Sequence, residues 1–438
     1  MNESTNRKAT RRDFLKTSAA VTGAGIIGQF TNVHAAGDDV IRVGLIGCGR
    51  GGSGISGGGR GRGAAMQCIN AGRNVVLYAM ADMFSEYLQY TRKYIADRHP
   101  DKVDVTDDRC FVGFDAYKKL LAIKEIDVVI LATPPGFRPQ HIRAAVDAGK
   151  HIFAEKPIAV DAPGVRTVMK ACEDAKSKKL SIVSGLCWRY HHGMRATFDR
   201  ILSGGVGDIV TLQCTYNTGG LWHVPRQEGW SDMEWQLRNW LYFTWLSGDH
   251  NVEQHIHSLD KMLWAMKDEP PVKAVGMGGR QVRTDPVFGH IFDHHSVVYE
   301  YANGVRVFSN CRQQVGCKND ISDFVFGTKG VCDVMRHRIR GEKPWHYQRP
   351  KKSTDRGMYQ NEHDELIASI RAGKPINNGD YMCKSTLMAI MGRMATYTGQ
   401  EITWEMAMNS KEDLMPQKLE FGPLPVPPVA KPGITKYF

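Results

Sequence analysis

Short apolar runs separated by amphipathic stretches dominate the chain after residue 36, and the first run leads directly into glycine. The runs lie at residues 41–46, 75–81, 128–132, 151–154 and 182–185. Helical periodicity between them is clearest at residues 116–123 and 139–148. Strands that alternate with helices predict right-handed crossovers and a parallel, doubly wound sheet. We therefore expect an α/β domain over residues 37–158.

A different pattern, with longer alternating strands and tight turns, begins near residue 210. Two hairpins are predicted, over residues 297–310 and 323–334. The first has Asn303-Gly304 at its turn, which predicts type I′, because that turn needs positive φ at both central positions. We expect an α+β domain with an open, largely antiparallel sheet over residues 159–415. Its helices are expected at residues 362–372 and 384–399.

The two ends of the chain differ from the rest. Residues 1–36 begin with charges, continue with an apolar stretch and end in small residues, which is the pattern of a cleavable signal peptide. Around Arg11-Arg12 the sequence resembles a twin-arginine export signal. That resemblance implies export of the folded protein, with a cofactor already loaded, through the twin-arginine machinery to the periplasm or beyond. Residues 416–438 are rich in proline and predict an extended arm.

Composition narrows the classes of partner. No apolar run reaches the roughly 18 residues that span a bilayer, so we expect no stable membrane insertion after cleavage. The net charge is +11, of which residues 1–36 carry +3 from five basic and two acidic residues. The densest basic stretch, residues 336–352, contains no nucleic-acid-binding motif, so it predicts a solvated surface loop and no nucleic acid partner. The ten cysteines are irregularly spaced, which favours buried thiols over disulfides or metal ligands.

A glycine-rich turn follows the first predicted strand, where a dinucleotide-binding fold places its phosphate-binding loop. Gly47 and Gly49 carry no side chains, which lets a pyrophosphate approach backbone N–H groups at the start of the next helix. A literal G-x-G-x-x-G motif continues to Gly52, but the loop runs on before a helix begins. We therefore predict an insertion after Gly49, with the glycines of the helix entry at Gly61 and Gly63.

An acidic residue, Asp82, ends the second predicted strand. Its carboxylate is placed to accept hydrogen bonds from the ribose hydroxyls of adenosine, and no Arg or Lys follows it immediately to bind a 2′-phosphate. The predicted cofactor is therefore NAD rather than NADP.

Several further stretches resemble the Gfo/Idh/MocA oxidoreductase family, whose members include inositol dehydrogenases and glucose–fructose oxidoreductase. They are Ala132-Thr133-Pro134-Pro135 with His141, Gly149-Lys150-His151, Glu155-Lys156-Pro157, Gly204-Gly205-Val206-Gly207-Asp208-Ile209 and Ile370-Arg371-Ala372-Gly373-Lys374-Pro375. The resemblance implies a Rossmann-type domain and a sugar, glycoside or polyol substrate. It implies cofactor contacts from Thr133, Pro134, Glu155, Lys156 and Pro157, a cis peptide bond before Pro157, and a homo-oligomer paired through an exposed sheet face.

Lys156 suits the chemistry of alcohol oxidation. Removal of hydride from a secondary alcohol builds negative charge on the oxygen unless its proton is taken, and a neighbouring ammonium stabilises the developing alkoxide. The resemblance likewise implies that Lys156 contacts both the substrate and the nicotinamide.

A predicted helix that begins near residue 249 has two different faces. At about 100° per residue, apolar side chains form one stripe and polar side chains form the opposite one. The apolar stripe contains Val252, Ile256, Leu259 and Leu263, and the polar stripe contains His250, Glu253, His257 and Asp260. Two histidines and two carboxylates in one row favour the wall of a site over a solvated helix face.

The family has an aspartate four residues before its general base, a histidine, and the matching residues here are Glu253 and His257. His257 is the expected base, because an unperturbed imidazole titrates near about 6.5. The change from Asp to Glu leaves the orienting role of Glu253 open. His250 is expected to bind substrate hydroxyls. The spacing of His250, Glu253 and His257 also fits zinc, but Lys156 would repel a cation, so we predict no metal.

Arg189 and Tyr190 occupy a segment that borders the substrate in the family, and we expect them to contact the substrate here.

Export adds a constraint on the reaction, since free NAD is expected to be scarce outside the cytoplasm. A tightly bound cofactor must then be recycled in place. An oxidoreductase that uses a second carbonyl compound meets this need. So does an NAD-dependent glycosidase that works by transient oxidation, elimination, hydration and re-reduction. A third alternative is a non-catalytic sugar-binding protein on the same fold.

Overall fold

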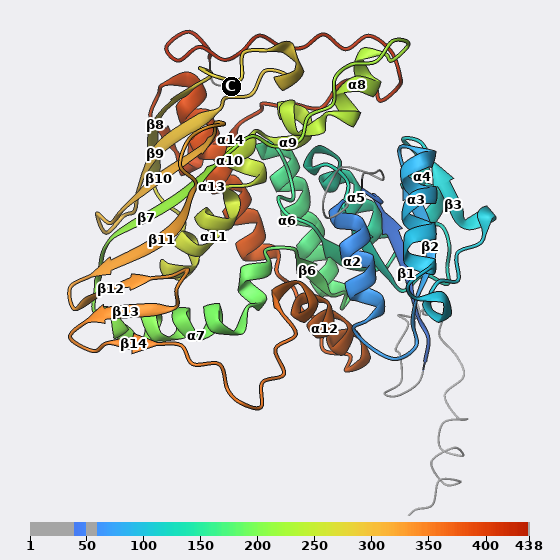
Figure 1. Cartoon of the computed structure of the whole chain (residues 1–438), viewed down its shortest axis with the longest axis horizontal. Helices are drawn as coiled ribbons and strands as arrows, with labels where there is room; N and C mark the ends of the chain where they lie inside the picture. The colour runs from blue at the N-terminus through green and yellow to red at the C-terminus, as the bar shows by residue number, and fades with distance from the viewer. Residues whose placement is uncertain (1–38, 50–58, 437–438) are drawn as a thin grey trace, which may run out of the picture. The chain divides into compact units, whose positions relative to one another are not determined.

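The computed structural model describes residues 39–49 and 59–436. Its first sheet has six parallel strands in the order β3-β2-β1-β4-β5-β6 (Figure 1). The strands are β1 (Ile41–Ile46), β2 (Val75–Asp82), β3 (Cys110–Val112), β4 (Val128–Leu131), β5 (His151–Ala154) and β6 (Ile182–Ser184). This confirms the predicted doubly wound sheet. The strand order reverses between β1 and β4, and ligands of such sheets bind in the crevice at that point.

Helices cover both faces of this sheet because its strands are apolar on both faces. Val128 and Ile130 of β4 pack with α2, α3 and α12, whereas the alternating Val129 and Leu131 pack with α4, α5 and α6. These helices are α2 (Arg60–Ile69), α3 (Ser85–Ala96), α4 (Ala116–Leu121), α5 (Arg138–Asp147), α6 (Ala162–Ser177) and α12 (Met358–Arg371). One of the helices predicted in the second half of the sequence, α12, therefore packs against the first sheet.

The second sheet is mixed and largely antiparallel, in the order β14-β13-β12-β11-β7-β10-β9-β8-β15. Only the β7–β10 pair is parallel among its described pairings. The strands are β7 (Ile209–Thr218), β8 (Lys273–Gly279), β9 (His294–Glu300), β10 (Arg306–Gln313), β11 (Asp320–Gly327), β12 (Gly330–Asp333), β13 (Arg338–Gly341), β14 (Trp345–His346) and β15 (Ile402–Thr403). This architecture agrees with the predicted fold class.

Two helices pack against one face of the second sheet. Almost every side chain of α13 (Gly379–Thr398) is buried, as expected for a helix that is apolar nearly all round. It packs against β8, β9, α6 and α11 (Ile256–Ala265). The opposite face carries exposed apolar side chains such as Met277 and Phe308. Shorter helices are α7 (His192–Arg200), α8 (Asp232–Arg238), α9 (Thr244–Ser247), α10 (His250–Glu253) and α14 (Trp404–Asn409).

The first hairpin forms, but the predicted type I′ turn is wrong. Gly304 has a φ of 82°, whereas Asn303 is not among the residues with positive φ. The N–H of Gly304 donates to the carbonyl of Tyr301 at 2.9 Å. The loop contains Ala302 as well as Asn303 and Gly304, so it is one residue longer than a type I′ loop. A three-residue loop of this kind is a type I turn followed by a glycine in the left-handed conformation.

The basic stretch 336–352 is not only a loop, because it contains β13 and the edge strand β14. The predicted arm packs on its own chain: the N–H of Leu424 donates to Asp232 Oδ2 at 3.0 Å, and that of Gly433 donates to the carbonyl of Thr398 at 2.8 Å. No helix in the described part of the chain is both long and apolar enough to cross a bilayer. The predicted signal peptide lies outside the described residues.

All ten cysteines lie in the described part of the chain and are free thiols, and all except Cys110 and Cys317 are buried. This confirms the interpretation of the cysteines as buried apolar side chains.

Candidate active site

A cavity of about 450 Å³ lies at the carboxyl ends of β1, β2 and β4. Gly47 and Asp82 line it from the first sheet, and Glu253 and His257 line it from the segment that leads into α11. Both halves of the sequence therefore contribute to one cavity.

The predicted phosphate-binding turn has the shape that a dinucleotide requires. Gly47 and Gly49 have φ values of 94° and 80°, and a Cβ on Gly47 would lie 2.5 Å from the backbone nitrogen of Thr133. At Gly61 a Cβ would lie 1.9 Å from the carbonyl oxygen of Gly47, so this glycine lets α2 pack tightly against the turn. Gly63 is under no such constraint and does not line the cavity. Gly52 lies outside the described residues.

Asp82 lines the cavity at the end of β2. Its carboxylate accepts hydrogen bonds from the N–H of Cys48 at 2.6 Å and of Phe84 at 2.9 Å, which fix its orientation. Burial raises the pKa of Asp82 to about 6, although these backbone hydrogen bonds oppose the shift. The carboxylate is thus held beside the glycine turn and is ionised at neutral pH.

Lys156 and Glu253 form an ion pair at the wall of the cavity. Lys156 Nζ lies 2.9 Å from Glu253 Oε1 and also donates to the Glu253 carbonyl. The two side chains are 13% and 16% exposed, so both are largely withdrawn from water but reach the cavity. The peptide bond between Lys156 and Pro157 is cis, as the family resemblance implies.

His257 lies in the same wall and is the best-placed proton acceptor. Burial lowers the pKa of His257 well below its ordinary value, and the charges of Lys156, Lys261 and Arg60 lower it further. Its Nδ1 has no hydrogen-bond partner among the described residues. The imidazole is therefore neutral at neutral pH, as a proton acceptor must be, but it is a weaker base than the free imidazole on which the sequence prediction rested.

The polar row containing Glu253 and His257 does not run along one straight helix. The chain leaves α10 at Glu253 and enters α11 at Ile256, and the N–H of His255 bonds to the carbonyl of His250, five residues back. This wider turn rotates the helix face. Glu253 and His257 line the cavity, but His250 and Asp260 do not.

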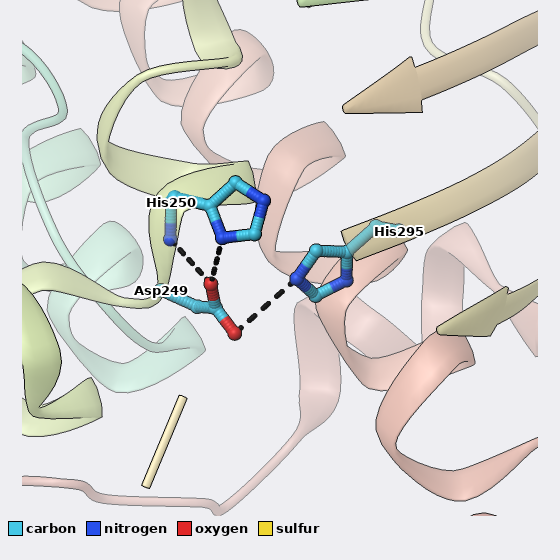
Figure 2. A group of neighbouring side chains, drawn as sticks. All are labelled: Asp249, His250 and His295. Carbon is cyan, nitrogen blue, oxygen red and sulfur yellow. Dashed lines mark hydrogen bonds and ion pairs between the residues drawn. The ribbon is translucent and has the colours of Figure 1, made fainter. Parts of the chain in front are cut away.

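His250 points into the interior beside Asp249 and His295 (Figure 2). Donor atoms of these three residues lie within 4.8 Å of one another, whereas the zinc alternative would need His250 to meet Glu253 and His257. The Asp249 carboxylate lies 2.7 Å from His250 Nδ1 and 3.2 Å from His295 Nε2. It also accepts from the hydroxyl of Tyr397 at 2.6 Å and from a backbone N–H at 3.0 Å. Asp249 is thus the centre of a hydrogen-bond network immediately before α10.

The substitution Asp249→Asn is expected to lower the free energy of unfolding by about 3–5 kcal/mol, because one partner of a buried charged network is lost. Burial alone would raise the pKa of Asp249, but His295 and His250 hold it well below its ordinary value. Urea unfolding measures the effect, with the exposed Asp107→Asn as the matched control. A loss no larger than that of the control would contradict this role.

Arg189 and Tyr190 lie in the core, outside the cavity. The Arg189 guanidinium pairs with Asp260 at 2.8 Å and with Asp268 at 2.7 Å. The Tyr190 hydroxyl donates to Asn378 Oδ1 at 2.7 Å. Their polar groups are therefore occupied by structural contacts.

Thr133, Pro134 and Glu155 line the cavity as the family resemblance implies, but Pro157 does not. The Glu155 carboxylate is fixed by Arg60, whose Nε lies 2.5 Å from Glu155 Oε1 and whose Nη2 lies 2.7 Å from the buried Glu362. Arg60 itself lines the cavity. Sequence reasoning missed this arginine, although it opens α2 directly after the glycine-rich loop.

Sequence reasoning also missed much of the cavity's aromatic and polar lining. These side chains come from loops and helix ends far apart in the sequence, so no periodic pattern joins them. They are Phe84, Tyr87, Phe114, Tyr117, Tyr216, Trp222, Arg238, Trp240, Gln254 and Tyr359. The sequence does show a cluster of aromatic residues at 230–245, but aromatic side chains suit a core as well as a cavity wall.

Residues 41–183 match a family model described as "Oxidoreductase family, NAD-binding Rossmann fold". The chain is 28% identical over 193 residues to 2,7-anhydro-N-acetylneuraminate hydratase from Escherichia coli, covering 44% of this chain and 47% of that protein. It is 27% identical over 192 residues to inositol 2-dehydrogenase 3 from Saccharopolyspora erythraea, covering 43% and 49%. The match spans about half the length of these curated relatives.

The fold also resembles the crystal structure of aldose-aldose oxidoreductase from Caulobacter crescentus complexed with glycerol. The TM-score is 0.63 at 18% identity, covering 83% of this chain and all of the other. This likeness concerns the fold alone. The family model and the relatives together support the resemblance of this chain to the Gfo/Idh/MocA family of NAD-binding oxidoreductases.

Proposed function

We propose that the chain is an NAD-dependent oxidoreductase that moves hydride between a hydroxyl group of a sugar or polyol and a tightly bound nicotinamide dinucleotide. One observation carries the proposal: Lys156 and His257 line the same cavity as the glycine turn and Asp82. The bound dinucleotide would supply the hydride acceptor, with Gly47, Gly49 and Asp82 holding its adenosine and phosphate groups.

The residues of this chain account for the remaining chemistry. The Lys156 ammonium, held by Glu253, donates a hydrogen bond to the substrate oxygen and stabilises its developing negative charge. The neutral imidazole of His257 accepts the hydroxyl proton. The substrate carbon would give up its hydrogen as hydride, with both bonding electrons, to the bound dinucleotide, and the alcohol would become a carbonyl compound.

The proposed preference for NAD over NADP rests on Asp82. The substitution Asp82→Ala is expected to weaken NAD binding about 10-fold to 100-fold, since a hydrogen bond to a charged group contributes roughly 1.5–3 kcal/mol. NADP binding should weaken less than NAD binding or become tighter, because the substitution also removes the repulsion between the carboxylate and the 2′-phosphate. Calorimetric titration of both dinucleotides measures the two changes, with the exposed Asp97→Ala as a control. Tighter binding of NADP than of NAD by the unaltered protein would contradict the proposed preference.

We further propose that the protein is exported by the twin-arginine route, works in the periplasm as a homo-oligomer and recycles its cofactor in place. The twin-arginine resemblance around Arg11-Arg12 supports export. Purification of the exported protein and gel filtration provide the test. Nicotinamide dinucleotide should elute with the protein, whereas a protein free of cofactor and with weak NAD affinity would contradict recycling in place.

The E. coli relative is compatible with one alternative, because that protein is a hydratase by name rather than a dehydrogenase. In the redox-neutral scheme, oxidation of a ring hydroxyl acidifies the neighbouring C–H, a glycosidic group is eliminated, water adds and the ketone is reduced again. A panel of sugars, polyols and glycosides separates the functions. Ketone formation that depends on an electron acceptor supports the oxidoreductase, and aglycone release without an acceptor supports the glycosidase. Binding without either reaction supports a sugar-binding protein.

A further inference from the structure

One end of the cavity is roofed by the region around α8, and the C-terminal arm packs behind this region without lining the cavity. Trp222, Leu237, Arg238 and Trp240 line the same cavity as Asp82 and the aromatic residues near it. Figure 1 shows the C-terminal arm, drawn in red, running past α8. The roof is therefore built by the same chain that forms the dinucleotide-binding sheet.

Arg238 is the main bridge between this roof and the first sheet's helices. Its Nη1 lies 2.7 Å from Glu86 Oε1 and donates to the Tyr87 hydroxyl at 3.3 Å, and both partners belong to α3. The guanidinium carbon lies 3.8 Å from the centroid of the Phe84 ring. The Arg238 side chain is 13% exposed and Phe84 is buried, so their cation–π contact is shielded from water, whereas Glu86 is 56% exposed and its ion pair with Arg238 lies at the surface.

The C-terminal arm holds α8 in this position. The N–H of Met233 donates to the carbonyl of Gly422 at 3.2 Å, and Gln236 Nε2 donates to the carbonyl of Leu424 at 2.6 Å. Asp232 in turn accepts from the N–H of Leu424 at 3.0 Å. These hydrogen bonds tie successive residues of the helix to one short part of the arm.

The arm also reaches the first sheet directly through Phe421. Its ring centroid lies 6.4 Å from that of Phe84 and 5.6 Å from that of Phe114, and both partners line the cavity. Asp82, Phe84 and Phe114 sit at the carboxyl ends of β2 and β3, the side of a doubly wound sheet that receives the adenosine half of a dinucleotide. The roof therefore covers the adenosine end of the proposed cofactor site.

We propose that α8 and residues 416–436 form a clamp that encloses the adenosine half of the cofactor. Release of the dinucleotide would then require the bridge from Arg238 to Glu86 and the aromatic contacts of Phe421 to separate. The clamp rests on the proposed function, since it retains the same cofactor that must be recycled in place. It gives the chain its own means of retention, without a residue from a second copy.

The test is the rate at which bound reduced dinucleotide leaves the full-length protein when excess unlabelled NAD is added, followed by nicotinamide fluorescence. Arg238→Ala should release it about tenfold faster, a change that corresponds to about 1.4 kcal/mol. Glu86→Ala should act in the same direction, and the double variant should add little to Arg238→Ala, because both changes break one bridge. Phe421→Ala should also accelerate release.

Arg306→Ala is the matched control. Arg306 is exposed, pairs with Glu300 of the second sheet at 3.1 Å and does not line the cavity, so its loss should leave the release rate unchanged. Thermal unfolding of each variant checks that α8 remains folded. Equal release rates in the folded wild type, Arg238→Ala and Phe421→Ala would overturn the clamp while leaving the proposed function intact. A wild-type protein that binds no dinucleotide would overturn both.

Discussion

Replacement of Lys156 by methionine is expected to slow turnover about 100-fold to 1,000-fold while the dinucleotide stays bound. Loss of one fixed hydrogen-bond donor to a developing oxyanion typically has an effect of this size. Lys156 is held for that role by Glu253, with Nζ and Oε1 2.9 Å apart, and the Lys156–Glu253 pair is mostly withdrawn from water. Methionine keeps the length and apolar stem of the lysine, so packing against the neighbouring wall should be preserved.

The effect is measured as the rate at which substrate reduces the bound nicotinamide in a single turnover. Lys170→Met, at an exposed lysine paired with Asp174, is the matched control and should react like the wild type. A second variant, Glu253→Gln, should lower the rate less, because it leaves the ammonium in place but removes its charged partner. Undiminished hydride transfer in Lys156→Met would remove Lys156 from the mechanism.

His257→Asn is expected to lower kcat about 100-fold to 10,000-fold, the range typical of a general base. The asparagine amide preserves polarity and approximate size but cannot take up the hydroxyl proton. The buried His255, which lies outside the cavity, offers a comparison for loss of an imidazole from the same segment. His255→Asn should lower the free energy of unfolding but should leave kcat largely unchanged.

The pH dependence gives an independent check on His257. Its pKa lies well below the ordinary value because of burial and the charges of Lys156, Lys261 and Arg60. The imidazole therefore remains neutral as the pH falls through about 6.5, where a free histidine would become protonated. The wild-type profile of kcat/KM should therefore show no acid limb at that pH that depends on His257, provided that the protein remains folded, whereas a limb from Asp82, whose pKa is about 6, would persist in His257→Asn. An acid limb near about 6.5 that disappears in His257→Asn would contradict the assigned environment.

Five of the six strands of the first sheet were predictable because they are continuous apolar runs, and several end in a turn with a chemical signature. The sixth, β3, is only three residues long and partly exposed, so no apolar run predicted it. Gly47, Asp82 and Lys156 follow such strands, and the topology brings the ends of parallel strands to one edge. The position of each residue along its strand therefore predicted its place in the cavity. No knowledge of distant contacts was needed.

The second half was less predictable, because its site depends on local departures from regular geometry. The wide turn at residues 254–255 separates His250 from Glu253 and His257, although an ideal helix would align all three. Arg189 was expected to contact the substrate, but its guanidinium is paired with two acidic side chains, one of them 79 positions away in the sequence. Its partner Asp268 comes from beyond the end of α11, and no local pattern links the two.

The aromatic roof of the cavity was also hidden from sequence reasoning. An aromatic side chain in a core and one in a cavity wall have the same local sequence character, and only the fold distinguishes them. Trp235 and Phe243 pack in the interior, while the neighbouring Trp240 lines the cavity. The same limit applies to the C-terminal arm, whose proline content predicts extension but does not identify the surface it covers.

The most direct test of hydride transfer is to incubate the purified protein with deuterated sugars and polyols, including deuterated myo-inositol. The mass of the bound dinucleotide is then measured by mass spectrometry. Deuterium should appear in the nicotinamide ring of the wild type with at least one of these compounds. It should be absent, or acquired far more slowly, in Lys156→Met. A dinucleotide that stays free of deuterium with every compound, in a protein that binds those compounds, would contradict hydride chemistry at this site.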